Sequence, residues 1–310
     1  MSDGPDIFLD DFEEINYPDD HKSGFVAIIG RPNAGKSTLL NAIIGEKLSV
    51  VTYKAQTTRH RITGIYSDEK TQIVFLDTPG MLSPEYKLHE AMMAAVDKAR
   101  TDADIIIHLV DGRNVEKAVE LVSYLANSKG KKILLAINKM DEASEENATE
   151  IEKKLSEEID YHSVFKISAL NKAGVDELIN TIKNELPDGP PYYDKDILSN
   201  QPQRFFAEEL IREQLFLQYD KEVPYSCAVN VVSYSEEEEI DHIHAEIVIE
   251  RDSQKGIIIG NKGKAIKKLG IESRKSIETL VGKKVNLQLF VKVRKKWRQN
   301  ETFLKSFGYR

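Results

Sequence analysis

The fold of this chain is decided by the stretch Gly30-Arg31-Pro32-Asn33-Ala34-Gly35-Lys36-Ser37. This stretch matches the phosphate-binding loop pattern G-x-x-x-x-G-K-S/T at every fixed position. The apolar run at 25–29 before it is typical of a buried strand, and apolar residues recur at helical spacing after it. Because the pattern requires strand, loop and helix in this order, the sequence predicts a nucleoside triphosphate site. The alternative is a glycine-containing turn that matches by chance.

The fixed positions of this phosphate loop have physical roles. Gly30 and Gly35 allow backbone angles that side chains disfavour, so that N–H groups and a helix N-terminus can surround the phosphates. We expect Lys36 to reach the β- and γ-phosphates and Ser37 to bind Mg²⁺. The residues expected to contact the nucleotide here are Gly30, Arg31, Pro32, Asn33, Ala34, Gly35, Lys36, Ser37 and Thr38.

A second motif selects the base. Asn138-Lys139-Met140-Asp141 follows the apolar run 133–137 and matches N-K-x-D. An ionised Asp141 can accept hydrogen bonds from guanine N1–H and the exocyclic amine, whereas adenine offers an acceptor and no amine at that edge. The wrong base leaves buried polar groups unpaired, so the motif predicts GTP and GDP as ligands. The expected base-binding residues are Asn138, Lys139, Asp141, Ser168, Ala169 and Leu170, with the Ala169 N–H facing guanine O6.

Two further segments supply the expected magnesium and catalytic groups. Asp77-Thr78-Pro79-Gly80 ends the apolar run 73–76, and we expect all four residues to contact the nucleotide. Asp77 is expected to hold Mg²⁺ through a water, and the Gly80 N–H to meet the γ-phosphate. Thr58, in the polar connection after the first helix, is expected to complete a magnesium shell with Ser37 and Asp77. The predicted catalytic groups are Lys36, Thr58, Gly80 and Asn33.

Met81 directly follows Gly80, where several small GTPases carry the glutamine that orients the attacking water. Methionine can neither orient water nor accept its proton, so slow intrinsic turnover is predicted, although Met81 also suits packing. Asn33 offers an amide oxygen near the β- and γ-phosphates, where a monovalent cation such as K⁺ can neutralise developing charge. The alternative is an asparagine that only shapes the loop.

The 310 residues are enough for about two domains. Residues 1–22 are expected to be an acidic disordered tail, and 188–203 a proline-rich linker. Between them, 23–187 alternates strands and helices, which predicts an α/β GTPase domain with a mostly parallel sheet. Residues 204–310 predict a second, α+β domain in the order helix-strand-strand-helix-helix-strand. The expected strands are 25–29, 61–66, 72–76, 104–110, 132–137, 163–167, 225–234, 242–250 and 284–293.

The second domain carries an RNA-binding pattern. Residues 251–310 hold 17 Lys and Arg against 4 Asp and Glu, although the whole chain has a net charge of −8. A G-x-x-G turn at 260–263 lies between two helical stretches, which is typical of a KH clamp for single-stranded RNA. The alternative is a basic amphipathic helix that only packs a core. The predicted RNA-binding residues are Gly260, Asn261, Lys262, Gly263, Lys264, Lys267 and Lys268.

Composition limits the place of action. The single cysteine, Cys227, excludes an internal disulfide framework, and no Cys/His cluster has zinc-ligand spacing. No apolar run has the length of a spanning helix, and the first residues lack the features of a signal peptide. We therefore expect a protein of the reducing cytoplasm.

From about residue 24 to 310 the chain closely resembles the Era family of bacterial ribosome-assembly GTPases. The phosphate loop, 55–61, 77–80, 138–141 and the segment 204–213 lie where that family has them. The resemblance implies a P-loop GTPase domain and a type II KH domain that binds the 3′ end of small-subunit ribosomal RNA. It also implies a role in small-subunit maturation, a monomeric state, peripheral attachment to the inner membrane, and a contribution of Thr52 and Lys54 to the cation site.

Two other functions stay open at this point. One is an RNA chaperone in which nucleotide occupancy alone matters and hydrolysis is incidental. The other is a GTPase of transfer-RNA modification or translation, against which the G-x-x-G domain argues.

The role predicted for Asn33 can be tested through the salt dependence of GTP hydrolysis. We expect K⁺ to stimulate GTP hydrolysis relative to Na⁺, because a cation beside Asn33 stabilises negative charge on the transferring phosphoryl group. Asn33→Ala should remove this stimulation. Phosphate release measured in the two salts is the assay, and equal rates in both salts for the unchanged chain would refute the cation site.

Overall fold

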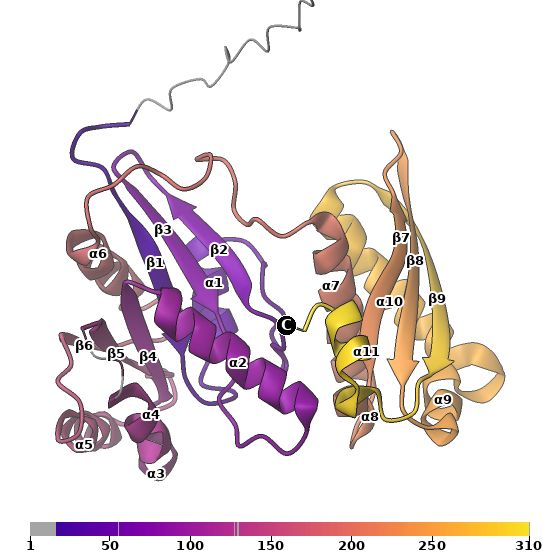
Figure 1. Ribbon diagram of the computed structural model, residues 1–310, viewed down its shortest axis with the longest axis horizontal. Coiled ribbons are helices and arrows are strands. Elements are labelled where there is room, and N and C mark those ends of the chain that lie inside the picture. The colour runs from indigo at the N-terminus through magenta and orange to yellow at the C-terminus, as the bar shows by residue number, and fades with distance from the viewer. Residues whose placement is uncertain (1–16, 55, 127, 129, 310) are drawn as a thin grey trace, which may run out of the picture.

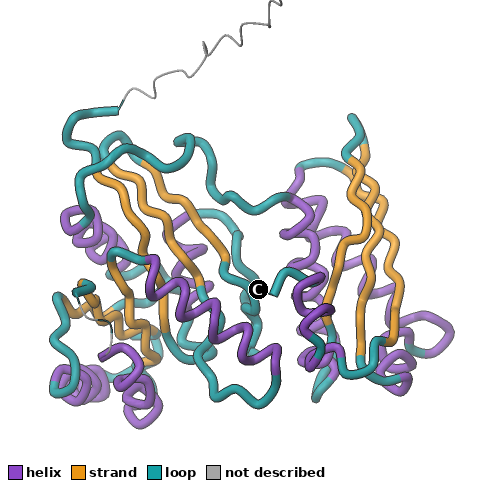
Figure 2. Tube along the Cα trace, in the orientation of Figure 1, coloured by secondary structure: helices purple, strands orange, loops and turns teal. Residues whose placement is uncertain are grey.

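The computed structural model describes residues 17–54, 56–126, 128 and 130–309 (Figures 1 and 2). Residues 1–16, which make up most of the predicted acidic tail, therefore lie outside the described residues. So does Ala55, in the connection that contains Thr58. Two domains stand side by side in Figure 1, and a segment without helix or strand connects α6 of the first to α7 of the second. The prediction of a GTPase domain followed by a KH domain is confirmed at this level.

The first domain is built on a six-stranded sheet in the order β2-β3-β1-β4-β5-β6. β2 pairs antiparallel with β3, and the other pairs are parallel. The strands are β1 (Lys22–Ile29), β2 (Ile62–Ser67), β3 (Thr71–Asp77), β4 (Ile105–Asp111), β5 (Lys132–Asn138) and β6 (Ser163–Lys166). All six predicted strands of this domain are present, with ends that differ by up to three residues.

Helices cover both faces of this sheet. The helices are α1 (Lys36–Ile44), α2 (Lys87–Asp102), α3 (Val115–Ala118), α4 (Val122–Ala126), α5 (Glu145–Ser156) and α6 (Val175–Glu185), with a 3-10 turn η1 (Val119–Leu121) between α3 and α4. α1 and α6 share one apolar core with the sheet, and α2 to α5 share the other. Near-continuous apolar strands such as Ile105-Ile106-Ile107 suit a sheet that is buried on both faces.

The second domain is a three-stranded sheet, in the order β7-β8-β9, packed against helices. β7 (Ala228–Ser235) pairs antiparallel with β8 (Ile240–Ile249), and β9 (Lys284–Val293) pairs parallel with β8. Its main helices are α7 (Gln203–Gln218), α9 (Asp252–Ile259) and α10 (Lys264–Val281), with short η2 (Asn261–Gly263) at the G-x-x-G turn. The chain then closes with η3 (Trp297–Gln299) and α11 (Glu301–Ser306).

The strand predicted at 225–234 is wrong at its start. Residues Val223–Ser226 form the short helix α8, and β7 begins only at Ala228. Pro224 lies in the first turn of α8, where its missing N–H costs no hydrogen bond. This local proline favours a helical turn over a strand at the start of the segment.

The two domains share an apolar cluster. Leu88 and Met92 of α2 pack with Val248, Trp297 and Leu304 of the second domain. The Trp297 indole N–H donates to the Ser226 carbonyl at 2.9 Å, so this large side chain is buried with its polar atom paired. The C-terminal helix α11 thereby shares an apolar cluster with α2 through Leu304, and Figure 1 places the end of the chain between the two domains.

His108 should make stability depend on pH. Burial in β4 lowers the pKa of His108 to about 4, and its Nε2 has no partner among the described residues. The unfolded chain binds a proton near pH 6.5 that the folded chain does not bind until about pH 4. His108 should therefore contribute a loss of stability of about 2 kcal/mol as pH falls from 7 to 5, whereas Glu208, whose pKa burial raises to about 7, contributes with the opposite sign.

Denaturant unfolding at the two pH values checks this expectation. His108→Gln should flatten the pH dependence, and His244→Gln, at an exposed position of β8, should leave it unchanged. Burial also lowers the pKa of His60 to about 4. His60 should therefore still contribute to the pH dependence of stability in both variants. An equal slope in His108→Gln and the unchanged chain would contradict the assignment.

Candidate functional site

The predicted nucleotide-binding segments meet at one edge of the first sheet. The phosphate loop follows β1, Thr78 to Gly80 follow β3, Lys139 to Asp141 follow β5, and Ser168 to Leu170 follow β6. Because β1, β3, β5 and β6 run parallel in one sheet, their carboxyl ends lie at the same edge, where α/β sheets bind ligands. A cavity of about 320 Å³ lies here, lined by the phosphate loop, 50–53, 56–58 and Gly80.

The phosphate loop has the conformation that an anion site requires. Gly35 has φ 101°, and a Cβ there would lie 2.2 Å from Asn138 Nδ2, so only glycine fits between the two loops. Lys36 is 5% exposed, and its ammonium donates to the carbonyls of Gly30 and Arg31 at 3.1 and 2.9 Å. Burial lowers the pKa of Lys36 to about 8, and the Asp77 charge opposes the change. A bound phosphate would stabilise this ammonium further.

The three predicted magnesium residues are in direct contact. Ser37 Oγ lies 2.8 Å from Thr58 Oγ1 and donates to Asp77 Oδ2 at 2.7 Å. Asp77 is fully buried, burial raises its pKa, and its Oδ1 has no partner among the described residues. Two hydroxyls and a carboxylate oxygen without a partner are the hard oxygen donors that Mg²⁺ prefers.

This donor set fits one magnesium ion together with phosphate oxygens. No cluster of three or more His, Cys, Asp or Glu side chains that could hold a metal occurs in the described part of the chain. Water and the nucleotide would supply the remaining ligands, as is usual for Mg²⁺ in phosphoryl-transfer sites. The bound ion would neutralise charge on the phosphates, and Ser37 and Thr58 would orient it.

Asn138 joins three segments of the site. Its Nδ2 donates to the Ala34 carbonyl at 2.8 Å, which agrees with the expected tether to the phosphate loop. Its Oδ1 accepts from the Ala169 N–H at 2.9 Å. The Ala169 N–H that was expected to face guanine O6 thus has a protein partner in this structure. The residue fixes the β6 loop relative to the phosphate loop, which the sequence did not suggest.

The other base-site residues lie close together. Ser168 Oγ donates to Asp141 Oδ1 at 2.5 Å, so the carboxylate is held in place with its other oxygen available. The Lys139 ammonium donates to the Asn33 carbonyl at 2.6 Å and to Asp111 at 2.9 Å. Leu170 is 72% exposed beside them. Asp111, at the end of β4, is a member of this network that no sequence motif indicated.

The loop that follows β3 is packed tightly on the phosphate loop. The Met81 N–H donates to the Gly30 carbonyl at 3.2 Å, and the Met81 side chain is 9% exposed in the core beneath α2. Met81 therefore packs, as its alternative interpretation held. Thr78 Oγ1 donates to the Ile28 carbonyl at 2.8 Å, which fastens the two strand ends together.

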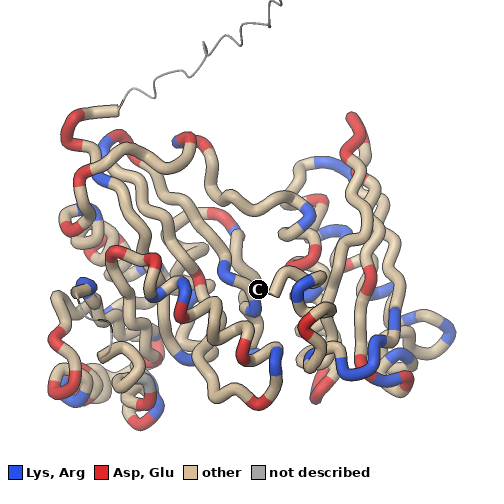
Figure 3. The backbone as a smooth tube through the Cα atoms, viewed as in Figure 1, with Lys and Arg blue, Asp and Glu red and all other residues tan. Residues whose placement is uncertain are grey.

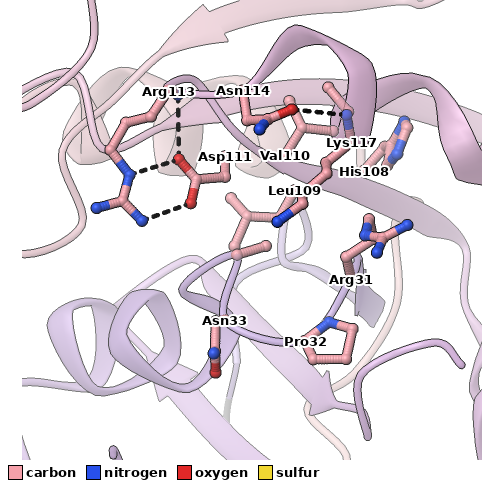
Figure 4. Close-up of a pocket in the computed structure, with 12 residues that line it drawn as sticks. Arg31, Pro32, Asn33, His108, Leu109, Val110, Asp111, Arg113, Asn114 and Lys117 are labelled. Atoms are coloured by element: carbon pink, nitrogen blue, oxygen red, sulfur yellow. Dashed lines mark hydrogen bonds and ion pairs between the residues drawn. The ribbon is translucent and has the colours of Figure 1, made fainter. Parts of the chain in front are cut away.

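A second cavity of about 530 Å³ adjoins the phosphate loop (Figure 4). Arg31, Pro32 and Asn33 lie on one side of it, and the end of β4 with Arg113 and Lys117 lies on the other. The Arg113 guanidinium binds the Asp111 carboxylate through Nε and Nη2 at 2.9 and 2.8 Å. This pair positions the Asp111 carboxylate, which also accepts a hydrogen bond from Lys139.

Asn33 faces the α1–β2 loop, residues 45–61. Its φ of 64° is in the left-handed region that asparagine tolerates, and its side chain is exposed. Its Nδ2 donates to the Tyr53 carbonyl at 3.2 Å. Thr52 lies in the same loop, where its Oγ1 is 2.7 Å from Thr57 Oγ1. The structure thus brings Asn33 and the predicted cation-site segment together.

The predicted RNA clamp is an exposed turn. Gly260 and Gly263 have φ of 69° and 76°, and Lys262 between them is also left-handed at 49°. A Cβ on Gly260 would lie 2.6 Å from the Ala265 Cβ. Asn261 is exposed, as are the predicted lysines 262, 264, 267 and 268, none of which is in an ion pair with a described residue.

A groove beside this turn could receive bases. It has a volume of about 330 Å³ between α10 and β9 and is lined by Ile266, Gly270, Ile271, Leu287 and Leu289, with Lys267 and Arg274 among its polar members. Figure 3 shows Lys and Arg gathered around α9 and the end of β9, while the four glutamates 236–239 lie at the opposite tip of the β7–β8 hairpin. The acidic residues therefore do not face the clamp.

Comparison with known proteins agrees with this geometry. Residues 25–139 match the family model described as a 50S ribosome-binding GTPase, and 222–298 match the KH domain model. The chain is 43% identical to GTPase Era of Lactobacillus delbrueckii subsp. bulgaricus over 290 residues, which cover 93% of this chain and 96% of that protein. The chain belongs to the Era family of GTPases. This confirms the family resemblance and the predicted GTPase activity.

Other Era proteins show the same extent of similarity. GTPase Era of Thermotoga maritima is 44% identical over 90% of this chain and 94% of that protein. An Aquifex aeolicus Era variant bound to GDP.AlF4⁻ superposes with a TM-score of 0.87 at 34% identity, covering 93% of this chain and 99% of that one. An Era structure in complex with MgGDPNP and nucleotides 1506–1542 of 16S ribosomal RNA gives a TM-score of 0.88 with the same identity and coverage.

Gly80 provides a test of the packed loops. A Cβ at this position would lie 2.7 Å from the Pro32 backbone, so Gly80→Ala must displace one loop from the other. We expect kcat for GTP hydrolysis to fall about tenfold or more, because small displacements of positioning groups are costly. Single-turnover hydrolysis with a thermal melt measures both activity and folding. Gly256→Ala, at a position with no atom within 4 Å of the added Cβ, is the control and should keep its rate.

Proposed function

We propose that this Era-family GTPase is a GTP-driven switch that binds the 3′ end region of small-subunit ribosomal RNA through its KH domain and assists maturation of the small ribosomal subunit. The observation that carries the proposal is a pair of sites on one chain: the Ser37, Thr58 and Asp77 oxygen cluster beside the nucleotide cavity, and the exposed G-x-x-G turn. The Era complex with a 16S ribosomal RNA fragment and a GTP analogue supports it.

GTP, GDP and Mg²⁺ are the proposed ligands of the first domain. In this proposal Lys36, Thr58 and Gly80 act on the γ-phosphate, and Asp141 reads guanine. Asn33 would hold a K⁺ ion, which its contact with the Tyr53 carbonyl supports by placing a second neutral oxygen donor nearby. Hydrolysis then ends the state in which the phosphate contacts hold the α1–β2 loop.

The G-x-x-G turn and its groove are the proposed RNA site. Glycines allow the sugar-phosphate backbone to approach the turn, and the apolar groove between α10 and β9 accepts unstacked bases. Crosslinking in cells followed by sequencing of the bound RNA tests the proposed partner. Recovery of the 3′ end of small-subunit ribosomal RNA supports it, and recovery of transfer RNA would contradict it.

The proposed place of action is the cytoplasm, where this RNA is assembled, with the chain acting as a monomer. No helix in the described ranges combines the length and apolarity needed to span a bilayer. Peripheral contact with the inner membrane is proposed on the family resemblance alone. Binding to vesicles with and without anionic lipid would test it.

Salt dependence reports the phosphate contacts of the clamp. Lys264→Gln and Lys268→Gln should each weaken RNA binding and reduce the slope of log K against log salt by about one, because each lysine releases one counterion. Binding of a fluorescent RNA over a salt series gives the slope. Lys305→Gln, exposed on α11, is the control whose slope should not change. Unchanged slopes in the first two variants would remove these contacts.

A further inference from the structure

The α1–β2 loop of the GTPase domain is fastened to the KH domain by Lys54. The Lys54 ammonium donates to the carbonyls of Phe216 and Tyr219 at 2.7 and 2.5 Å and to the Asp220 carboxylate at 2.8 Å. These acceptors lie at the C-terminal end of α7, where helix carbonyls lack partners and the helix dipole is negative. One ammonium with three donors satisfies all three acceptors.

The Lys54 side of this contact is shielded from solvent. The Lys54 side chain is 10% exposed, whereas Asp220 is 79% exposed. Burial opposes the charge on Lys54, but Asp220 and Tyr53 outweigh it, so the pKa of Lys54 is raised. The residue therefore stays charged at neutral pH.

The same loop segment contacts the phosphate loop on its other side. The Tyr53 carbonyl, one residue before Lys54, accepts from Asn33 Nδ2 at 3.2 Å. The Lys54 carbonyl accepts from Thr57 Oγ1 at 2.7 Å, next to Thr58 of the magnesium site. A movement of Lys54 must therefore move groups that face the nucleotide.

The same end of α7 also contacts the elements on both sides of the RNA clamp. The Tyr219 hydroxyl donates to the Ile258 carbonyl at 2.8 Å, and Gln218 Nε2 donates to the Ala265 carbonyl at 2.8 Å. Ile258 lies in the last turn of α9 and Ala265 in the first turn of α10, so these bonds hold both sides of the G-x-x-G turn.

We propose that Lys54 is a positioning residue that links the two sites: through α7 it holds the Tyr53 carbonyl against Asn33, and through Tyr219 the same contact reaches the RNA clamp. RNA bound at the clamp then favours one arrangement of the α1–β2 loop, and the γ-phosphate favours the same arrangement. By thermodynamic linkage, each ligand raises the affinity for the other by the same factor. This inference rests on the proposed function.

The test is the nucleotide dependence of RNA affinity in the full chain. The probe is a synthetic RNA of nucleotides 1506–1542 of 16S ribosomal RNA, titrated with a non-hydrolysable GTP analogue or with GDP bound. We expect the ratio of the two dissociation constants to be about fivefold or more in the unchanged chain. In Lys54→Met this ratio should fall to about one.

A matched control separates this role from general weakening of the domain contact. Lys47 lies in the same loop and pairs with Glu213 of α7 at 2.7 Å, but none of its hydrogen bonds or ion pairs involves the phosphate loop. Lys47→Met should keep the ratio. If Lys47→Met loses it equally, or Lys54→Met keeps it, the Lys54 route is refuted.

A second variant protects the test against misfolding of Lys54→Met. Tyr219→Phe removes only the hydroxyl, which donates to the Ile258 carbonyl and accepts from Gln218 Nε2, and this hydroxyl contacts no nucleotide-site residue. It should also bring the ratio toward one. If the unchanged chain binds the RNA and hydrolyses GTP, but its RNA dissociation constant is the same with the GTP analogue and with GDP, the inference is refuted and the proposed function stands. If the unchanged chain does not bind the RNA, the proposed function itself is refuted.

Discussion

The parallel pairing of β1 with β3 and β4 is the constraint on which the nucleotide site depends. It brings the phosphate loop and Asp77 to the same sheet edge, because β1 and β3 end within one register step of each other. Burial of the apolar strands on both faces stabilises this arrangement. The polar residues at their carboxyl ends are therefore available to bind the nucleotide. Asn138 then fixes the loops to each other with two short hydrogen bonds.

The domain interface contains buried arginines that donate hydrogen bonds from one domain to the other. Arg59 is 1% exposed and donates to the carbonyls of Cys227 and Pro224 at 2.6 and 2.9 Å. Arg212 is buried with Glu209 and also donates to the Thr57 carbonyl. Burying such ions is costly, and removal of one partner leaves an uncompensated charge worth about 3–5 kcal/mol. The interface therefore specifies one geometry more strongly than apolar contact alone would.

The sequence identified the segments that meet at this sheet edge, because its motifs are local and their spacing is diagnostic. Ser37, Thr58 and Asp77 were assigned from three separate segments, and the parallel sheet brings them into contact. The contacts of Lys54 with Phe216 and Tyr219 could not be predicted, since they join residues more than 160 positions apart without any motif. Helix α8 was missed for the opposite reason, because a local proline outweighed an apolar pattern.

The α1–β2 loop has two sets of partners that it cannot satisfy independently. Thr58 faces the magnesium site, while the carbonyl of the preceding residue, Thr57, accepts from Arg212 of the KH domain. Hydrogen bonds weaken steeply with angle, so a peptide that rotates toward one site loses its contact with the other. An element held in this way has a small number of discrete arrangements, and two sites that bias the same element are coupled. The buried Arg212 and Lys54 contacts give that coupling a physical path, because both attach the loop to the helix that leads to the RNA clamp.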